Sequence, residues 1–452
     1  MMVNLRRIIR PFASSTVVFD LAVLFCVFLA MMATLFPKLG SAYYYPAWDQ
    51  AHHLMVAEGF HYAISNLDAS AFWIALINSH TIYPPLFHIM AALGFMLFGK
   101  QATIGPIVNA PFLLLLGMST YQLCRIAVSK KAALLSGLLI FFVPLYLDLW
   151  ADAMTDISSV ALFVTLYWTV LKTDYFSSVK WSVISGIVAC LLVLSRYAFF
   201  SAALPLIFYV IQSIRRNRGD AVTNILLAVI MMVPAEFWYI SHWATMQEKL
   251  SFFGNPDNYP VKLYNLPGLF DPENWLYFIR ASVQVQGIGL IPMAIFGASL
   301  TGKSAGKTPY GRYLLWSVAG NFIIQTLWLD KIPKYVEYSY PIILMLSIHW
   351  IMNLRRGRLL AVVALTGAMA LNLIIAVIRF PMEKPIVSVT PKIHILPGVR
   401  FEYDSVPWPM ERIIREIPTT RENPARLLVL TDTDTLNSVT LSYYAMRQQK
   451  TL

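Results

Sequence analysis

Charged residues are scarce in this sequence, and their scarcity excludes the ordinary soluble classes. Asp, Glu, Lys and Arg make up 13% of the 452 residues, whereas a soluble globular domain carries roughly 25%. Hydrophobic residues account for 58% of the chain, and the mean hydropathy is +0.60. They form runs of about 20 residues, which is long enough for a helix to cross a bilayer. The sequence therefore predicts an all-α polytopic membrane protein.

Cysteine is also scarce, with three residues in the whole chain. Cys26, Cys124 and Cys190 all lie inside apolar runs, so they form neither a disulfide framework nor a metal-ligand spacing. The adjacent residues His52 and His53 would diverge by about 100° on a helix, so they would not face one ligand together. The pattern implies no cofactor, and a divalent metal is left open as an alternative.

The distribution of positive charge favours a membrane partner over nucleic acid. The formal net charge is +11, but the basic residues stand in short clusters between apolar runs. The first apolar run, residues 15–36, is too long for the core of a signal peptide and is predicted to remain as an anchor helix. We expect a multi-pass protein of the plasma (inner) membrane with a cytoplasmic N-terminus. By the positive-inside rule the cytoplasmic clusters are residues 6–10, 125–131, 172–180, 215–218, 303–312 and 355–358.

The order of runs and clusters predicts about 11 spans, which puts the C-terminus on the periplasmic or extracellular side. Residues 86–99 lie in a run of about 14 apolar residues, fewer than the ~17 that a span needs, so they predict a re-entrant or in-plane helix. An alternative with a second span near residues 69–77 gives about 13 spans and the same sidedness. The later expected spans are 132–149, 156–171, 181–195, 197–213, 222–241, 281–300, 313–329, 335–352 and 359–378.

The chain divides into a membrane module and a smaller tail. Residues 1–380 are expected to carry two long outer loops, residues 37–85 and 242–280, the first with in-plane helices. Residues 381–452 predict a small α/β segment on the outer side. In that tail "RLLVLTD" is typical of a buried strand, and "TLNSVTLSYYAMRQQ" of the helix that follows it. One strand is not stable alone, so it either pairs within the tail or the segment is incomplete.

Acidic side chains on the expected outer face are the first functional candidates, because ionisable groups near a bilayer are costly. Asp49 follows Trp48 at the start of the helix-like stretch "DQAHHLMVAEGF", where it is either a helix N-cap or a functional acid. Asp152 and Asp156 lie where a span begins, in "WADAMTDISSVALFV". They either cap that helix or form an acidic patch with Asp148.

Cations on two tight outer hairpins are the second group of candidates. Arg196, in "LLVLSRYAFF", either extends to lipid headgroups or serves the site. Lys331 and Lys334, in "WLDKIPKYVEYSYP", either pair locally with Asp330 and Glu337 or face a ligand. An acid and several cations on one face suit sugar transfer from a lipid phosphate. Fixed cations stabilise the departing phosphate, and a carboxylate takes the proton of the incoming hydroxyl.

The order of these motifs resembles that of the GT-C glycosyltransferases, in particular the branch of protein O-mannosyltransferases and lipid A aminoarabinose transferases. In that family an Asp-Glu pair in the first loop precedes a "KPPL"-like segment. A "TD" opens a later span, and a "K-x-x-RY" hairpin precedes a late one. The matching positions here are "WDQ" at 48–50, "YPPL" at 83–86, "TD" at 155–156 and "KIPKY" at 331–335.

This resemblance implies roles for individual residues. Asp49 would be the catalytic base, and Asp156 a second catalytic acidic group at the site. Arg196 and Lys334, with Lys331 beside them, would face the donor phosphate. The further substrate-binding residues implied are Gln50, His53, Tyr83, Asp152, Tyr197 and Tyr335.

The sequence departs from the family pattern at two of these positions. Gln50 stands where the family has the second acid, so the base role rests on Asp49 alone, and Gln50 would donate a hydrogen bond to the sugar. Lys334 stands where an arginine is common, and it would bind phosphate as a point charge without bidentate geometry.

The function predicted from these features is transfer of a sugar from a polyprenyl-phosphate donor to an acceptor at the outer face. The acceptor is a glycolipid, a glycan or a protein, and membrane lipids are the surrounding partners. Two alternatives remain open. A secondary transporter would place its charges in broken helices at mid-membrane, whereas a non-catalytic binder of lipid-phosphate sugars would keep the cations without needing Asp49.

Overall fold

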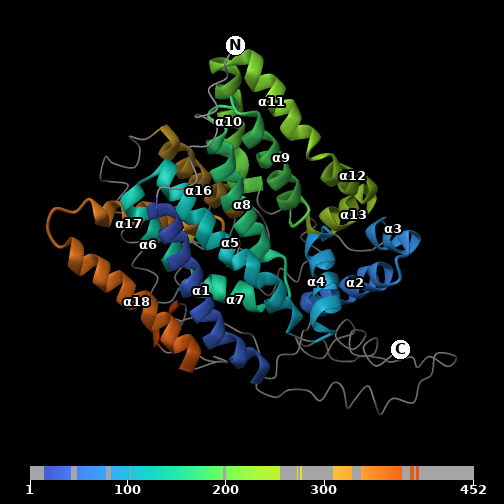
Figure 1. Ribbon diagram of the computed structural model, residues 1–452, viewed down its shortest axis with the longest axis horizontal. Coiled ribbons are helices and arrows are strands. Elements are labelled where there is room, and N and C mark those ends of the chain that lie inside the picture. The colour runs from blue at the N-terminus through green and yellow to red at the C-terminus, as the bar shows by residue number, and fades with distance from the viewer. Residues whose placement is uncertain are drawn as a thin grey trace.

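The computed structural model is a bundle of helices with a smaller group of helices at one end (Figure 1). Backbone polar groups in lipid have no water to bind, so apolar runs satisfy them internally by folding as helices. The structure describes residues 15–41, 48–77, 83–101, 103–196, 200–254, 272, 275–276, 309–327, 337–378, 387–390 and 393–395.

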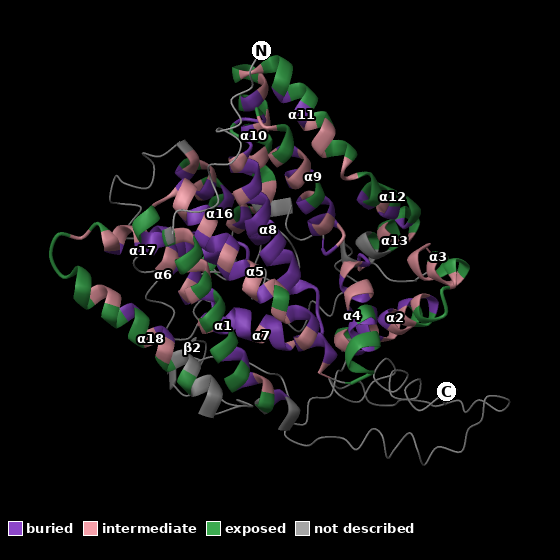
Figure 2. Ribbon diagram, viewed as in Figure 1, coloured by how far each residue is buried: buried purple, intermediate pink, exposed green. Residues whose placement is uncertain are grey.

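Helix α8 (Asp156–Lys172) is the centre of the bundle. Of its 17 residues 15 are buried, and the helix is almost wholly purple in Figure 2. Helix α5 (Ile104–Ala127) packs against α8 and against α6 (Lys130–Ile140), while α9 (Val179–Val193) packs on the other side of α8. Helix α17 (Tyr340–Met352) is also largely buried and packs against α6.

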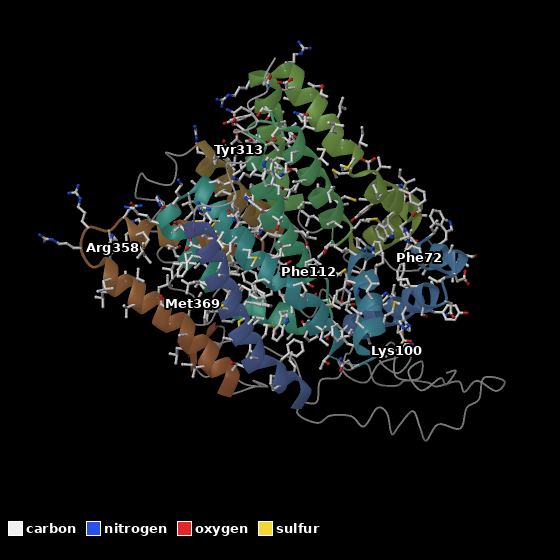
Figure 3. The ribbon with its side chains drawn as sticks, in the orientation of Figure 1. Phe72, Lys100, Phe112, Tyr313, Arg358 and Met369 are labelled. Carbon is white, nitrogen blue, oxygen red and sulfur yellow. The ribbon has the colours of Figure 1, made fainter. Side chains whose placement is uncertain are left out.

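The outer helices present large apolar side chains away from the core, as helices in contact with lipid do. Helix α10 (Phe200–Arg216) packs against α16 (Pro309–Leu327), and α11 (Arg218–Ile230) packs against α9. Helices α1 (Ser15–Ser41) and α18 (Arg358–Ile378) run along one edge (Figure 1). On α18, Met369 is buried, while Arg358 is exposed at the margin of the molecule (Figure 3).

Two of the expected spans are bent, which the sequence analysis did not predict. Helices α6 and α7 (Pro144–Ala151) meet at 48°, and so do α11 and α12 (Val233–Ser241). Pro144 and Pro234 each stand in the first turn of the second helix. A proline lacks the N–H that would continue the preceding helix and disfavours helical geometry in the residue before it.

In the part of the chain that the structure describes, two helices are long and apolar enough to cross a membrane by themselves, Thr16–Pro37 and Ile104–Ala127. The number rises to four if each bent pair is one span. Leu86–Phe98, Val179–Val193, Tyr340–Met352 and Arg358–Leu371 are shorter apolar helices. The counts of about 11 or 13 spans stay predictions, and the expected span 281–300 lies outside the described residues.

Helices were expected in the first outer loop, and the structure places three of them in and after it. They are α2 (Trp48–Ser65), α3 (Ala69–Ile77) and α4 (Leu86–Phe98). Helix α4 has 13 residues, short of the ~17 needed to span, and it packs against α2 and α5. The N–H of Leu86 donates to the carbonyl of Leu194 at 3.0 Å, which ties α4 to the end of α9. Helix α13 (Trp243–Gly254) opens the second outer loop.

The described part of the tail is a short antiparallel hairpin that the sequence analysis did not predict. Strand β1 (Val387–Thr390) pairs with β2 (Ile393–Ile395), with Val387 opposite Ile395 and Ser388 opposite His394. The strand and helix predicted at residues 426–432 and 435–449 lie outside the described residues.

Candidate active site

Two sets of hydrogen bonds join the start of α2 to distant parts of the chain. Asp49 lies in the first turn of α2 with an exposed side chain, and its Oδ2 accepts a hydrogen bond from Tyr83 Oη at 3.2 Å. Beside it, Gln50 Nε2 donates to Asp152 Oδ1 at 3.2 Å, and Gln50 Oε1 accepts from the N–H of Ala153 at 3.3 Å. Three segments that are distant in sequence therefore meet at the start of α2, at Asp49 and Gln50.

The position of Asp49 bears on the capping alternative. Helix α2 begins at Trp48, so Asp49 is its second residue. A carboxylate in the first turn is favoured by the helix dipole. Its hydrogen bond, however, goes to Tyr83 in the segment before α4. The Asp49 carboxylate thus interacts favourably with the dipole of α2 and is also exposed at the protein surface.

His53 lies beneath this arrangement and is completely buried. Its Nδ1 and Nε2 of His88 are 2.8 Å apart, a hydrogen bond that joins α2 to α4. The ring of His53 also packs against the ring of Tyr83, with centroids 4.5 Å apart. In the structure His53 supports Tyr83 from below, and its predicted contact with substrate stays a prediction. His52 is partly exposed on the same helix.

The turn between α7 and α8 carries Asp152, and α5 holds it in place. Asn109 is fully buried, and its Nδ2 donates to the carbonyl oxygens of Asp152 at 2.7 Å and Met154 at 3.3 Å. Gly105 allows α5 to approach closely, because a Cβ there would lie 2.6 Å from the Cα of Ala153. The backbone that presents Asp152 is therefore held by α5 as well as by Gln50.

A buried ion triad forms the second candidate group. Arg196 Nη1 binds Asp156 Oδ1 in a short contact and lies 3.4 Å from Glu337 Oε1. Both carboxylate side chains are fully buried, and the arginine side chain is 11% exposed. The alternative in which Arg196 extends to lipid headgroups does not fit, because the guanidinium lies between two acids inside the protein.

Glu337 is the residue of this group that sequence reasoning did not assign to the site. From the sequence it was expected only as a local ion-pair partner of Lys331 and Lys334. Its signal was an acid in the otherwise apolar and aromatic stretch "YVEYSYP". Tyr146 Oη donates to the Glu337 carbonyl at 2.8 Å, and the next residue, Tyr338, shares a 2.7 Å hydrogen bond with Ser159. The turn that begins at Glu337 is thus held by α7 and α8.

The contacts at the start of α2 and the ion triad are neighbours. Asp152 belongs to the first and Asp156 to the second, and a separation of four residues limits their Cα atoms to a distance of about 14 Å. Asp156, predicted as a second acidic group, lies in the triad and is the first residue of α8. Among the described residues no group of three His, Cys, Asp or Glu side chains is arranged to hold a metal ion. Four predicted site residues lie outside the described residues: Tyr197, Lys331, Lys334 and Tyr335.

Comparison with known proteins decides the fold. Residues 83–238, about a third of the chain, match the model of the family described as dolichyl-phosphate-mannose-protein mannosyltransferase. Two crystal structures of ArnT from Cupriavidus metallidurans superpose with TM-scores of 0.53 and 0.52 at 15% and 16% identity. The first is bound to undecaprenyl phosphate and the second is in the apo state. The chain has the GT-C fold.

An archaeal GT-C structure agrees. The oligosaccharyltransferase of Archaeoglobus fulgidus in complex with Zn and sulfate superposes with a TM-score of 0.52 at 14% identity, over 88% of this chain. The ArnT superpositions cover 82% and 80% of this chain. The chain spans 66% and 65% of the ArnT chains and 55% of the archaeal one. Among curated proteins none matches the sequence significantly.

The GT-C fold confirms the recognition made from the order of the motifs and the prediction of an all-α polytopic membrane protein. The match to the family model includes Tyr83, Asp152, Asp156 and Arg196 but begins after Asp49. The sidedness of the termini and the choice of membrane stay predictions.

Proposed function

We propose that the chain is a membrane glycosyltransferase that transfers a sugar from a polyprenyl-phosphate donor to an acceptor at the outer face. The observation that supports this best is the position of Asp49. Its carboxylate is exposed and hydrogen-bonded by Tyr83, and Gln50 links the same helical turn to Asp152. An acid that is open to substrate and fixed by its neighbours is what a general base requires.

In the proposed reaction the acceptor hydroxyl attacks the anomeric carbon of the donor sugar. The new C–O bond forms while the bond from that carbon to the phosphate oxygen breaks. The Asp49 carboxylate takes the hydroxyl proton, and the electron pair of the broken bond leaves with the polyprenyl phosphate. This direct displacement inverts the anomeric carbon, as the family resemblance also implies.

The departing phosphate gains negative charge, so the site needs cations. We propose Lys331 and Lys334 for this task, because they precede the turn that begins at Glu337. Arg196 binds both Asp156 and Glu337 through Nη1, so any contact with phosphate would use the other nitrogens of its guanidinium. By binding Glu337, Arg196 would also hold in place the end of the segment that carries Lys331 and Lys334.

The donor class rests on chemistry and on one structural relative. The ArnT structure that shares the fold is bound to undecaprenyl phosphate, which makes a lipid-linked phosphate the natural leaving group to propose here. A sugar on such a lipid has to be processed at the membrane. We propose a glycolipid, a glycan or a protein as the acceptor.

The transporter alternative finds less support in the two bent helix pairs. In transporters, broken helices at mid-membrane carry or face ionisable groups that bind substrate or ions. Here the breaks consist of Phe141, Phe142 and Val143 in one pair and Met231 and Met232 in the other. The ionisable residues of the candidate site lie elsewhere, at helix ends.

Asp49→Asn tests the proposal and distinguishes an enzyme from a non-catalytic binder. The variant keeps size and hydrogen-bonding capacity but loses basicity, so transfer should fall by roughly 10²–10⁴-fold. Undecaprenyl phosphate binding should be retained. Transfer is measured by mass spectrometry of envelope glycolipids, glycans and glycoproteins from cells that express the parent, the variant or no protein.

Asp68→Asn is the matched control. Asp68 lies in the same outer loop, and its Oδ1 accepts the N–H of Ala71 at 2.9 Å where α3 begins. Asparagine keeps that cap, so transfer should be unchanged. Full transfer by Asp49→Asn would refute the role of Asp49 as base. An envelope identical with and without the protein would refute the proposed enzyme.

A further inference from the structure

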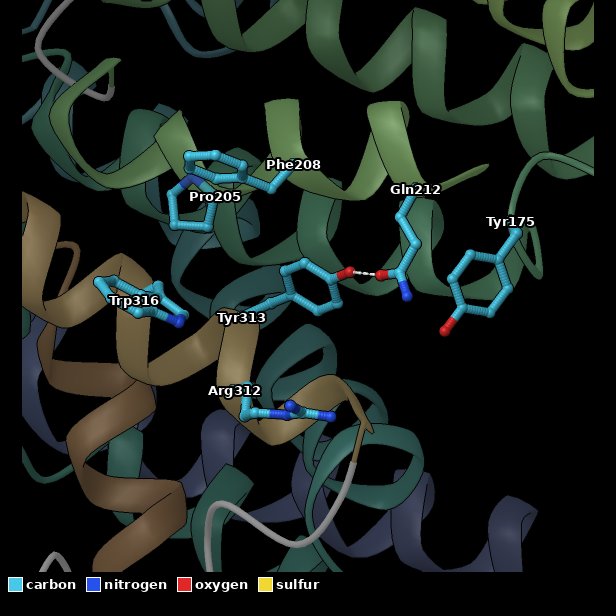
Figure 4. Close-up of a pocket in the computed structure, with 7 residues that line it drawn as sticks. All are labelled: Tyr175, Pro205, Phe208, Gln212, Arg312, Tyr313 and Trp316. Atoms are coloured by element: carbon cyan, nitrogen blue, oxygen red, sulfur yellow. Dashed lines mark hydrogen bonds between the residues drawn. The ribbon is translucent and has the colours of Figure 1, made fainter. Parts of the chain in front are cut away.

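A cavity of about 460 Å³ lies between α10 and α16, and none of the residues that line it belongs to the candidate active site (Figure 4). Its volume is within the range of small-molecule sites, about 300–1,000 Å³. Arg312 and Trp316, in the first half of α16, line it. The turn of Glu337 comes after the far end of α16, and 19 residues of helix extend about 28 Å. Arg312 is therefore at the opposite end of α16 from that turn, and the lining extends from it to Pro205 in the second turn of α10.

The cavity combines apolar walls with one cationic side chain. Phe208 of α10 and Trp316 of α16 line it, and they are 65% and 66% exposed. Tyr313 Oη donates to Gln212 Oε1 between the two helices, so this polar pair is satisfied internally (Figure 4). Arg312 is the charged member of the lining and is exposed. Such a lining suits a ligand with a long apolar part and a negative head.

The backbone of one wall of the cavity is held by hydrogen bonds to neighbouring helices. Asp174, Tyr175 and Phe176 have φ values of 47°, 57° and 56°, a left-handed run that side-chain-bearing residues rarely adopt. The N–H of Tyr175 donates to Tyr209 Oη at 2.8 Å, and Asn224 Nδ2 donates to the Phe176 carbonyl at 2.7 Å. These contacts hold the backbone on either side of the Tyr175 ring, which lines the cavity and stacks on the Tyr209 ring with centroids 5.0 Å apart.

Positive charge is concentrated around this wall. The Arg216 guanidinium lies over the Tyr175 ring, 4.4 Å from its centroid, and Arg215 precedes it at the end of α10. The acid of this turn, Asp174, is not part of the lining. The side of the cavity lined by Arg312 and Tyr175 thus lies at the end of the bundle that carries basic clusters, where a bilayer presents its headgroups.

We propose that this cavity binds an anionic glycerophospholipid, with the headgroup phosphate at Arg312 and an acyl chain along Phe208 and Trp316. The negative charge of the lipid headgroup would bind the exposed Arg312. Its acyl chain would cover the aromatic rings of Phe208 and Trp316, which water would otherwise surround. It is the lipid of the surrounding leaflet, and it is separate from the sugar donor at the other end of the bundle.

The test is native mass spectrometry of the full-length protein titrated with single lipids in detergent. Phosphatidylglycerol and phosphatidylcholine with identical acyl chains are compared, since they differ in net charge. We expect saturable binding of phosphatidylglycerol about tenfold tighter than of phosphatidylcholine, the effect of one charge-assisted contact at an exposed site. Arg312→Gln should abolish this preference. Trp316→Ala should weaken binding of both lipids.

Arg358→Gln is the matched control, because Arg358 is an exposed arginine at the start of α18 and is not part of the cavity lining. It should leave both affinities unchanged. An equal loss in Arg358→Gln would refute the site in favour of general charge attraction, and so would equal binding of the two lipids. Displacement of phosphatidylglycerol by inorganic phosphate, or tighter binding of undecaprenyl phosphate, would show that another ligand is the occupant.

Discussion

Arg196→Met removes the cation that two buried carboxylates share. Asp156 and Glu337 are fully buried, and the arginine side chain is 11% exposed, so little water can replace it. Removing one partner from a buried ion pair costs about 3–5 kcal/mol, because the remaining charge loses its compensation. Glu337→Gln is different, because the short contact between Arg196 and Asp156 remains. We expect it to cost about 1 kcal/mol, the size of one hydrogen bond.

The measurement is the free energy of unfolding in mixed micelles, followed by tryptophan fluorescence as denaturing detergent is added. Arg358→Met serves as the control, because Arg358 is exposed on α18 and such a surface change stays within about 0.5 kcal/mol. The double variant Arg196→Met with Asp156→Asn should recover part of the loss, because it removes one of the two buried charges. A cost below about 1 kcal/mol for Arg196→Met, or equal costs for Arg196→Met and Glu337→Gln, would contradict a desolvated triad.

Three further predictions concern the contacts around Asp152. Gln50→Glu would place a second carboxylate beside Asp152, so the added group should have a raised pKa in the folded state; the thermal midpoint should then fall below that of the parent at pH 7.5 and recover towards pH 5. Asn109→Leu should lower the free energy of unfolding by about 1–3 kcal/mol, because the carbonyl oxygens it binds would lose a buried donor; a neutral result would mean that water replaces it. Gly105→Ala should displace the turn at Ala153 and cost about 1–3 kcal/mol, while an unchanged thermal midpoint would show that α5 can move away at no cost.

Hydropathy was sufficient to predict several helices of the membrane module, because an apolar run in lipid has few options besides a helix. The predicted run 156–171 corresponds to α8, and 359–378 corresponds to α18. The short helix predicted at residues 86–99 is α4. The bends at Pro144 and Pro234 could have been predicted from the prolines themselves, since a proline inside an apolar run interrupts the helical hydrogen bonds.

The pairings within the site could not be predicted in the same way. Tyr83 and Asp49 were both chosen from motifs, but their hydrogen bond depends on how α2 and the segment before α4 pack. Arg196 was predicted at a surface hairpin, and it lies buried beside Glu337, 141 positions later in the chain. The periodicity of hydrophobic residues in a sequence describes a single helix. Whether a charged side chain is buried depends on how several distant segments pack around it.

The order in which the triad can form during synthesis follows from its spacing in the chain. Asp156 and Arg196 are 40 residues apart and lie at the same end of the adjacent helices α8 and α9. This helical hairpin can therefore leave the translocation machinery with its acid and its cation already neutralising each other, which lowers the cost of moving both into lipid. Glu337 is made 141 residues after Arg196, on the order of ten seconds later at typical rates of synthesis. Glu337, which precedes α17, then joins an ion pair that has already formed. Its carboxylate is therefore inserted when Arg196 is already in place to bind it.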